Sequence, residues 1–540
     1  MSHAERPTPP LPLARLEAAL AALPGRYPGP GGAVAVVHRG EVLLRHAWGW
    51  ADAERRIPFT PRTHALICSI TKQFTCSVLL DRFPDPTVLD DRVRDHLPRL
   101  EGERLGILDL ANNQSGLRDY WATAMLCGSP AEAPFGPAEA KRLIGRTRSL
   151  HFAPGTRSSY CNQNFRILSD ILEGETGQPF DALLRQHVFD RAGMEDAVLN
   201  PDTSAVAGGT VGYEGSVEAG FRPAVNRIHW TGDAGLAATL DDMIAWERFI
   251  DATRDEDGGL YRRLGTPNRF RDGTPAGYGF GLGRPTVLGR AATAHAGGLR
   301  GWRSFRCNLP AERLSVVVLF NHMADPRAAA LDLLRAALDE PASGDAGADL
   351  PALPSHWQGA FEDGEMGLGI RLSRDAQDRL RIDLGSGFET LAPQPDGSAA
   401  GASNRLREED GVLWLERPND NLRSTLLPLP EAPVPQGLAG RYHCAELDAT
   451  LHIEEAGGVL YAAPSGELGG GMMQPLIPLG GAGGRGDGER TDIWRMPCPR
   501  ALDFAPPGDW TIAARRDGTG AVRDLRVGCW LARGLDYRRV

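Results

Sequence analysis

A serine and a lysine three residues apart, Ser69 and Lys72, could carry out nucleophilic chemistry by their types and spacing. They follow a short apolar segment, residues 64–68, that is typical of a strand, and they begin an amphipathic segment that is typical of a helix. Residues three apart share one face of a helix, so a helix that begins at or near Ser69 would place the hydroxyl beside the amine. The spacing predicts a nucleophile next to its base.

Lysine is rare in this chain, and this makes Lys72 stand out. Of the 59 lysines and arginines, two are lysine, Lys72 and Lys141. A lysine can lose its proton when it is desolvated or lies near other cations, whereas an arginine effectively cannot. The alternative is that Lys72 is an ordinary surface charge, so the assignment needs partner residues.

Two further short motifs supply candidate partners. Tyr160 and Asn162 form the one Tyr-x-Asn of the chain, and His295 and Gly297 belong to one of two His-x-Gly triplets. The other triplet, residues 38–40, lies in a presumed hairpin turn and is explained by turn chemistry. In the order Ser-x-x-Lys, Tyr-x-Asn, His-x-Gly, the three motifs become specific.

This order resembles that of the serine penicillin-recognising enzymes, whose third element is usually Lys-Thr-Gly. The histidine at position 295, a β-rich carboxy-terminal region, and residues 113–121, 158–162 and 527–534 resemble the bacterial serine-type D-aminopeptidases over essentially the whole chain. The resemblance implies an α/β serine β-lactamase-like catalytic domain, with an antiparallel sheet flanked by helices and a helical lobe. Two small all-β barrel domains would follow it, and a cleft between the lobes would hold the site.

The catalytic roles follow from the chemistry of these residues. Ser69 would attack a carbonyl carbon and form an acyl-enzyme, which water then hydrolyses. Lys72 and Tyr160 are the candidate bases, because a lysine cation favours a tyrosinate and a neutral amine can accept a proton. We expect these two groups to titrate as a coupled pair. Asn162 would hydrogen-bond the substrate amide or the Lys72 amine.

Backbone groups would bind the oxyanion of the tetrahedral intermediate. The N–H of Ser69 is one donor, and the resemblance implies that the N–H of Gly298 is the other. Glycines at 297 and 298 would let the substrate approach this backbone closely.

The residue at position 295 bears on the charge of the substrate. Histidine in place of lysine removes a permanent positive charge, so recognition of a free carboxylate should weaken and a free amine becomes tolerable. The resemblance implies that Asp503, in a loop at 495–509 that reaches the active site, provides the counter-charge for that amine. The alternative is that Asp503 is an exposed loop carboxylate.

Alternating strands, helices and linker-like composition divide the chain. Predicted elements include a hairpin of residues 33–37 and 41–50, a helix over 239–250 capped by Thr239, strands at 302–307 and 314–320, and a helix over 327–338. The predicted parts are a catalytic domain (1–338), a linker (339–353), a β-barrel domain (354–432) and a second β-barrel domain (433–540).

Composition restricts the location and the partners. The net charge of −10 and pI of 5.8 argue against nucleic acid or an anionic membrane as the main partner. The first residues have no apolar run of the secretory kind, and the eight cysteines form no C-x-x-C pair, so we expect a cytoplasmic protein with reduced thiols and no metal or cofactor. The resemblance implies a homodimer and a small peptide or amino-acid amide as substrate.

The predicted function is an aminopeptidase that hydrolyses an N-terminal D-amino acid from peptides, amides or esters, with D-alanine-like residues favoured by the resemblance. One alternative is an esterase or β-lactamase-type acyl hydrolase of the same fold. Another is a catalytically inactive binding protein.

Overall fold

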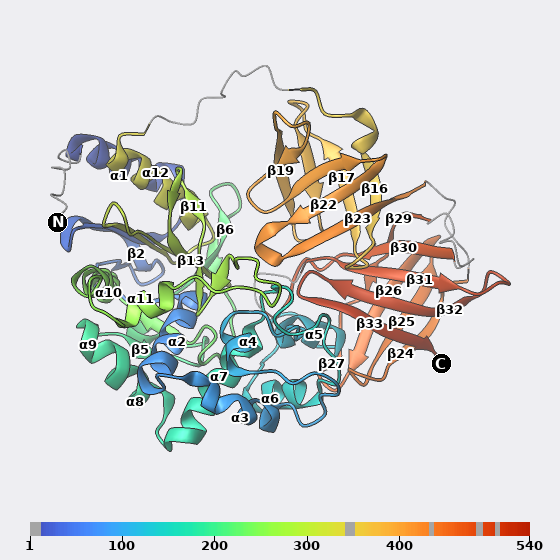
Figure 1. The fold of residues 1–540 in the computed structure, drawn as a ribbon, viewed down its shortest axis with the longest axis horizontal. Coiled ribbons are helices and arrows are strands. Elements are labelled where there is room, and N and C mark those ends of the chain that lie inside the picture. Colours follow the sequence, from blue (N-terminus) through green and yellow to red (C-terminus); the bar gives the residue numbers. More distant parts are fainter. Residues whose placement is uncertain (1–11, 341–350, 431–436, 482–489, 503–507) are drawn as a thin grey trace.

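An eight-stranded antiparallel sheet forms the centre of the amino-terminal part (Figure 1). The computed structural model describes residues 12–340, 351–430, 437–481, 490–502 and 508–540. The strands of this sheet, in spatial order, are β3 (Ile57–Pro58), β2 (Glu41–Asp52), β1 (Gly31–His38), β15 (Leu314–Phe320), β14 (Trp302–Leu309), β13 (Thr293–Leu299), β10 (Leu282–Gly283) and β9 (Tyr278–Gly279).

The central strands are buried on both faces. Val34 and Val36 of β1 pack with the terminal helices α1 (Leu13–Arg26) and α12 (Pro326–Leu338) on one face. The intervening Ala33 and Ala35 belong to the larger core on the opposite face, because successive side chains of a strand point to opposite sides. The predicted hairpin, strands and closing helix are confirmed.

The larger core joins the sheet to a helical lobe. Its helices are α2 (Thr71–Arg82), α3 (Asp90–His96), α4 (Ile107–Ala111), α5 (Tyr120–Leu126), α6 (Pro137–Arg146), α7 (Asn162–Thr176), α8 (Phe180–Leu184), α9 (Asp190–Ala192), α10 (Leu240–Ala252) and α11 (Leu260–Gly265). Short strands accompany them, namely β4 (Ala65–Leu66), β8 (Leu236–Ala238) and β5 (Val198–Leu199) in one small sheet, the pair β6 (Tyr213–Ser216) and β7 (Gly220–Pro223), and the pair β11 (Thr286–Val287) and β12 (Arg290–Ala291).

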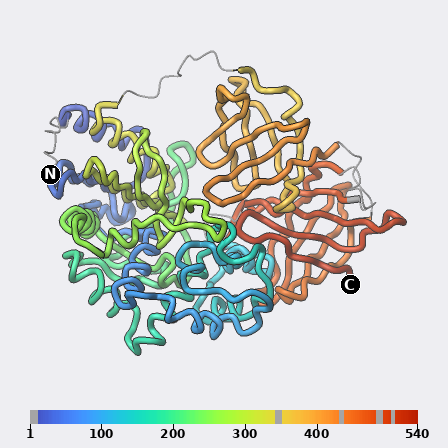
Figure 2. Tube along the Cα trace, viewed as in Figure 1, coloured from blue at the N-terminus to red at the C-terminus, as the bar shows by residue number. Residues whose placement is uncertain are grey.

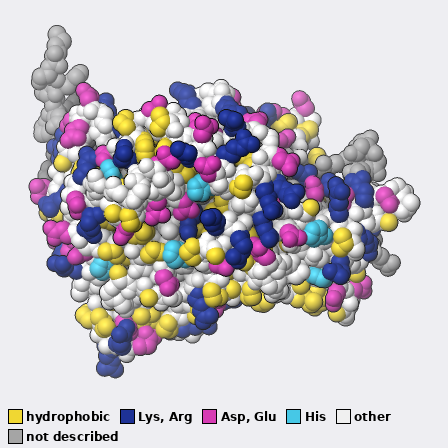
Figure 3. All heavy atoms as spheres, turned by 90° about the horizontal axis from the view of Figure 1, so that it is seen from below, with side chains coloured by type: hydrophobic (Ala, Val, Ile, Leu, Met, Phe, Trp, Pro, Cys, Tyr) yellow, Lys and Arg dark blue, Asp and Glu magenta, His cyan; other side chains and the backbone are white. Residues whose placement is uncertain are grey.

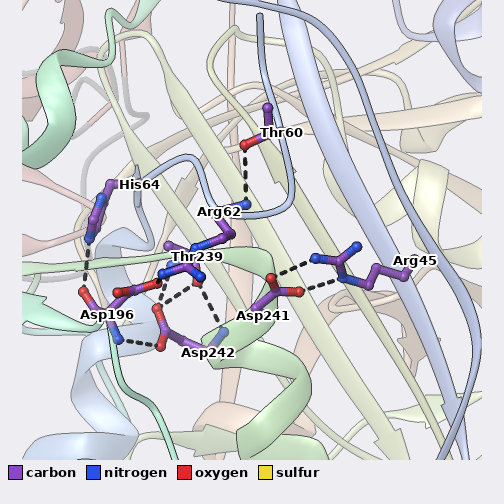
Figure 4. A network of polar contacts seen from close by, with 8 residues as sticks. All are labelled: Arg45, Thr60, Arg62, His64, Asp196, Thr239, Asp241 and Asp242. Carbon is purple, nitrogen blue, oxygen red and sulfur yellow. Dashed lines mark hydrogen bonds and ion pairs between the residues drawn. The ribbon is translucent and has the colours of Figure 1, made fainter.

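A polar network at the start of α10 fixes the chain that leads to Ser69 (Figure 4). Thr239 caps the helix as predicted, since its hydroxyl accepts from Asp242 N and the Asp242 carboxylate accepts from Thr239 N. Asp242 also accepts from the backbone N–H of Asp196 at 3.0 Å, and the Asp196 carbonyl lies 2.8 Å from His64 Nε2. His64 immediately precedes β4, so the network holds the entry to the Ser69 turn.

The segment around Ser69 differs in detail from its predicted structure. Within residues 64–68, the strand is confined to Ala65–Leu66, and a 3₁₀ turn, Cys68–Ile70, precedes α2. Cys68 adopts a φ of 53°, a left-handed conformation that is unfavourable for a residue with a side chain. The strained turn lies against β13 and β14 and so presents Ser69 beside the sheet.

The first β region is a closed barrel, drawn at the upper right of Figure 1. Its strands are β16 (Gly359–Asp363), β17 (Gly369–Arg374), β18 (Leu380–Asp383), β19 (Phe388–Pro393), β20 (Ala399–Ala400), β21 (Arg405–Glu409), β22 (Val412–Arg417) and β23 (Leu422–Leu429). Its interior is a separate core of mostly leucine and isoleucine side chains around Trp357. This barrel matches the predicted class.

The second β region is a ten-stranded half-barrel sheet. Its strands are β24 (Gly440–Cys444), β25 (Ala449–Ala456), β26 (Val459–Gly466), β27 (Gly469–Gly470), β28 (Gln474–Pro475), β29 (Ile477–Gly481), β30 (Arg490–Met496), β31 (Trp510–Arg516), β32 (Val522–Cys529) and β33 (Ala532–Arg539). In Figures 1 and 2 it lies beside the helical lobe, and most of its buried side chains belong to the same core as the lobe.

Hydrogen bonds join this sheet to the chain before α5. Arg118 Nε donates to the Arg533 carbonyl at 2.6 Å, and Arg118 also pairs with Glu446 at 3.0 Å. The backbone N–H of Asp119 donates to the Leu531 carbonyl at 3.0 Å. The carboxy-terminal sheet is therefore attached to the catalytic lobe by buried contacts.

The predicted domain boundaries stay predictions. Most of the expected linker and the expected boundary at 432 and 433 lie outside the described residues. Among the helices that are described, none combines the length and apolar character needed to cross a membrane.

Candidate active site

A cavity of 590 Å³ lies where the Ser69 turn, the edge of the main sheet and the helical lobe meet. Five of the predicted site residues line it, namely Ser69, Tyr160, Asn162, Gly297 and Gly298. Residues that are more than 200 positions apart in the sequence therefore share one cavity, in the cleft predicted between the lobes.

Lys72 lies behind Ser69 and is fully buried. Its Nζ is 3.0 Å from Ser69 Oγ, 2.9 Å from Asn162 Oδ1 and 2.6 Å from the carbonyl oxygen of Asp233. Of the two contacts expected for Asn162, the structure shows the one with Lys72.

Burial has a direct consequence for the charge of Lys72. It lowers the pKa of this amine to about 8, although the carboxylates of Asp233 and Asp119 oppose the shift. An amine with this pKa is neutral in a sizeable fraction of molecules near neutral pH. Lys72 can therefore act as a base toward the Ser69 hydroxyl.

Tyr160 lies on the other side of this pair. The Lys72 amine is 4.8 Å from the centre of its ring, and the side chain shares a hydrogen bond with Ser69. Burial nevertheless raises the pKa of Tyr160 far above its usual value, and the Ser69 hydrogen bond only partly opposes this shift. Of the two candidate bases, Lys72 is therefore the better suited to accept the proton of Ser69, because burial favours its neutral amine and keeps Tyr160 a neutral phenol.

Asp119 positions Asn162 and was not found from the sequence. Its carboxylate accepts from the backbone N–H of Asn162 at 2.5 Å and caps α5 by accepting from the N–H groups of Trp121 and Ala122. Burial raises the pKa of Asp119 to about 6, although these hydrogen bonds and Lys72 oppose the shift. An isolated Asp before an aromatic run is a recognisable helix cap, but nothing in that signal indicates the link to Asn162.

His295 lies behind the cavity wall, with 8% of its surface exposed. Its Nε2 is 3.1 Å from the Tyr278 hydroxyl, and its Nδ1 is 2.6 Å from the Ala296 carbonyl. The carbonyl can only accept, so Nδ1 carries the proton and Nε2 accepts from Tyr278. Burial lowers the pKa of His295 to about 3, and the nearby Lys72 adds to this shift. The imidazole is neutral.

The two glycines at the edge of β13 have different surroundings. A Cβ atom at Gly297 would lie 2.3 Å from the Ile67 carbonyl and 2.1 Å from Ser304 Oγ. At Gly298 it would meet only the guanidinium of Arg303, at 2.9 Å. Gly297 is therefore required for the close packing of β13 against the Ser69 turn, whereas Gly298 lines the open cavity.

Asp503 lies outside the described residues. The chain just before it is held against the catalytic lobe, because Arg300 donates to the Ala501 carbonyl at 2.9 Å and Arg500 pairs with Glu132. Glu132 also accepts from Arg300 at 2.6 Å. The first part of the predicted loop therefore packs near the residues that follow Gly298.

Other cavity residues were also missed from the sequence. They include Trp121, Trp230, Arg303, Asp325 and Leu531. Trp121 and Leu531 lie in segments that carry the family resemblance, but no pattern in the sequence assigns any of the five to the site, and only the folded chain places them in the cavity of Ser69.

Comparisons with known proteins agree with this architecture. Residues 16–340 match the β-lactamase family, and residues 352–538 match the family described as D-aminopeptidase, domain B. A similar solved structure is the octameric penicillin-binding protein homologue from Pyrococcus abyssi, with a TM-score of 0.51, 16% identity and coverage of 97% of this chain and 99% of that one. SurE gives a TM-score of 0.53 at 19% identity, covering 77% of this chain and 99% of its own. The fold and site thus define a β-lactamase-like serine hydrolase.

Full-length relatives define the family further. The D-aminopeptidase of Gluconobacter oxydans (strain 621H) is 51% identical over 535 residues, covering 98% of this chain and 99% of the relative. The D-aminopeptidase of Brucella canis is 44% identical, covering 98% of this chain and all of the relative. This chain belongs to the D-aminopeptidase family.

Proposed function

We propose that this protein removes an N-terminal D-amino acid, of the D-alanine kind, from peptides, amides or esters through an acyl-enzyme on Ser69. The observation that carries the proposal is the contact of Ser69 with a buried Lys72 in a cavity that Tyr160 also lines. The identity with named D-aminopeptidases over nearly the full length supports the reaction and its stereochemistry.

Acylation begins with proton transfer from Ser69 to neutral Lys72. The Ser69 oxygen forms a bond to the carbonyl carbon of the substrate, and the backbone N–H groups of Ser69 and Gly298 stabilise the oxyanion. Asn162 and the Asp233 carbonyl hold the resulting Lys72 cation in place. The bond from carbon to the leaving group then breaks.

Tyr160 acts as a proton relay in this scheme. The departing nitrogen needs a proton, and the neutral Tyr160 phenol can donate one and recover it from the Lys72 cation. Water then attacks the acyl-enzyme with the same groups in reverse, which releases the D-amino acid and restores the Ser69 hydroxyl. The high pKa of Tyr160 keeps the phenol protonated before each transfer and favours its rapid reprotonation by the Lys72 cation.

The charge at the edge of β13 suits a substrate with a free amine. His295 is neutral, so it does not repel an ammonium group, and its contact with Tyr278 keeps it behind the wall. We assign the counter-charge for the ammonium to Asp503 on the basis of the family resemblance. The anchored segment before Asp503 supports this assignment.

We further propose a cytoplasmic homodimer that binds small peptide or amino-acid amide substrates and does not use nucleic acid or a membrane as partner. The burial of all eight cysteine side chains supports a reducing compartment. On the face drawn in Figure 3, basic and acidic side chains are interspersed, and the net charge is −10. The dimer rests on the family expectation alone, and sedimentation velocity tests it.

The decisive experiment measures release of p-nitroaniline from D-Ala-p-nitroanilide, with L-Ala-p-nitroanilide and a chromogenic cephalosporin in parallel. We expect turnover of the D-anilide alone, and its loss in Ser69→Ala. Turnover of only the cephalosporin or of a simple ester would favour an acyl hydrolase of the same fold. Absence of any turnover would favour a binding protein.

A further inference from the structure

The tip of the β32–β33 hairpin lies between the barrel and the active-site cavity. Two residues form its turn, Trp530 and Leu531, between Cys529 and Ala532. Trp530 packs against the core of the barrel, and its ring contacts Arg417 at 3.8 Å. Leu531 packs against the core of the catalytic lobe and lines the cavity that holds Ser69. One turn therefore contacts both neighbouring parts of the molecule.

The backbone of this turn is fixed to the residues that position the site. The Leu531 carbonyl accepts from Asp119 N at 3.0 Å, and the Arg533 carbonyl accepts from the buried Arg118 at 2.6 Å. The Asp119 carboxylate in turn accepts from the N–H of Asn162. Because its backbone is held at these points, the turn keeps the Leu531 side chain at a constant place in the cavity wall.

The residues that line the cavity differ in their exposure to solvent. Trp121 and Trp230 are buried, with 4% and 2% of their surface exposed, and the backbone of the half-buried Leu531 is hydrogen-bonded to Asp119, two residues before Trp121. These three lining residues therefore mark the more closed end of the cavity. Asp325 and Arg327 line the other end and are exposed to solvent. The acyl group is still bound to Ser69 when the leaving group departs to solvent, and water releases it only in the second half-reaction. The D-residue therefore belongs at the closed end.

We propose that Leu531 is a specificity-determining residue, which limits the size of the side chain of the N-terminal D-residue. The leucine fills the closed end from the carboxy-terminal sheet and leaves room for a methyl group more readily than for a longer chain. In an apolar pocket, one methylene of substrate changes kcat/KM by about 10- to 200-fold. The inference rests on the proposed function and adds a residue that sets its substrate range.

The test compares Leu531→Ala with the unchanged protein on D-alaninamide, D-leucinamide and D-phenylalaninamide. We expect the kcat/KM of D-leucinamide relative to D-alaninamide to rise at least about tenfold in the variant. The ratio of D-Ala-p-nitroanilide to D-alaninamide, which changes only the leaving group, should stay constant. Leu468→Ala is the matched control, because Leu468 is a half-buried leucine of the same interface that packs against the same core away from this cavity.

The outcomes separate this inference from the proposed function. If the unchanged protein hydrolyses no D-amino-acid amide, the proposed function fails and the inference fails with it. If it hydrolyses D-alaninamide but Leu531→Ala leaves the side-chain ratio unchanged, only the role of Leu531 is overturned. A change confined to the leaving-group ratio would also overturn it. Leu531→Val enlarges the cavity less than Leu531→Ala and should shift the side-chain ratio in the same direction. It replaces Leu531→Ala in the test if that variant does not fold.

Discussion

The carboxylate of Asp119 accepts the backbone N–H of Asn162 at 2.5 Å, and the Asn162 side chain accepts from Lys72 at 2.9 Å. The same Asp119 caps α5, and its own N–H donates to Leu531 in the carboxy-terminal sheet. Asp119 therefore connects the proposed base, Lys72, with the wall of the cavity and with the carboxy-terminal sheet. It acts through Asn162 and is a positioning residue.

Replacing Asp119 by Asn should change the pH dependence of the enzyme. The negative charge of Asp119 raises the pKa of Lys72, so its loss should lower that pKa and shift the acid limb of the activity profile to lower pH. The measurement is the rate of inactivation by diisopropyl fluorophosphate from pH 5 to 9, because this reagent has no ionisable group, and a limb at unchanged pH would contradict the coupling. Asp170→Asn removes another carboxylate with a raised pKa, a partly exposed one that is paired with Arg166, and is the control.

The reactivity of Ser69 should increase as the pH rises through about 8. Lys72 accepts a proton only when neutral, and its pKa is about 8, so protonation at lower pH removes the base. The amine of the substrate titrates in the same pH range as Lys72. The reactivity of Ser69 should therefore be measured as the rate of inactivation by diisopropyl fluorophosphate, which has no ionisable group. We expect roughly a tenfold fall in the rate of inactivation per pH unit below this limb. A flat profile would exclude Lys72 as the base, and Ser69→Ala controls for labelling elsewhere.

Sequence reasoning located the parts of the site that are encoded locally. The spacing of Ser69 and Lys72 was sufficient to predict their contact, although α2 begins at Thr71 and a 3₁₀ turn precedes it. The cap at Thr239 also follows from local chemistry. The fold class and the family followed from motif order, since motifs that are far apart could be compared with a known pattern.

Contacts between residues that are far apart in the sequence could not be predicted from the sequence. Leu531 enters the cavity because a hairpin tip more than 400 residues away from Asp119 packs against it, and no local signal records that distance. The choice between Lys72 and Tyr160 as the base also stayed open, because a sequence shows that the two groups can be partners but not the desolvation that raises the pKa of Tyr160.

Removing Glu247 should destabilise the catalytic lobe. Glu247 and Arg306 form a fully buried ion pair at 2.6 Å, and Arg306 also donates to Tyr261. Glu247→Ala leaves the guanidinium buried without its carboxylate, which costs about 3–5 kcal/mol. Calorimetry should show a clear fall in Tm. Arg62→Ala breaks a pair whose arginine is exposed and should change stability by less than about 1 kcal/mol. Equal effects of the two variants would contradict the argument.

Gly297 and Gly298 should respond differently to the same substitution. Alanine at 297 would press against the Ile67 carbonyl and push the Ser69 turn away from β13, whereas alanine at 298 displaces only the flexible end of Arg303. A displacement of about 1 Å at a reacting group can cost about 100-fold in rate. We expect such a loss of kcat for Gly297→Ala and a near-normal kcat for Gly298→Ala, which keeps its N–H. Similar activities of both variants would show that the β13 edge tolerates repacking.

Replacing Asp503 by Asn should weaken recognition of the substrate ammonium group. If this carboxylate pairs with the ammonium as proposed, its loss should lower kcat/KM for D-alaninamide by about 30-fold, which corresponds to about 2 kcal/mol. D-lactamide is the matched control substrate, because a hydroxyl replaces the ammonium and its kcat/KM should hardly change. The neutral His295 offers no compensating charge in either case. Equal losses for both amides would indicate a general effect on the cavity and would remove the ammonium assignment from Asp503.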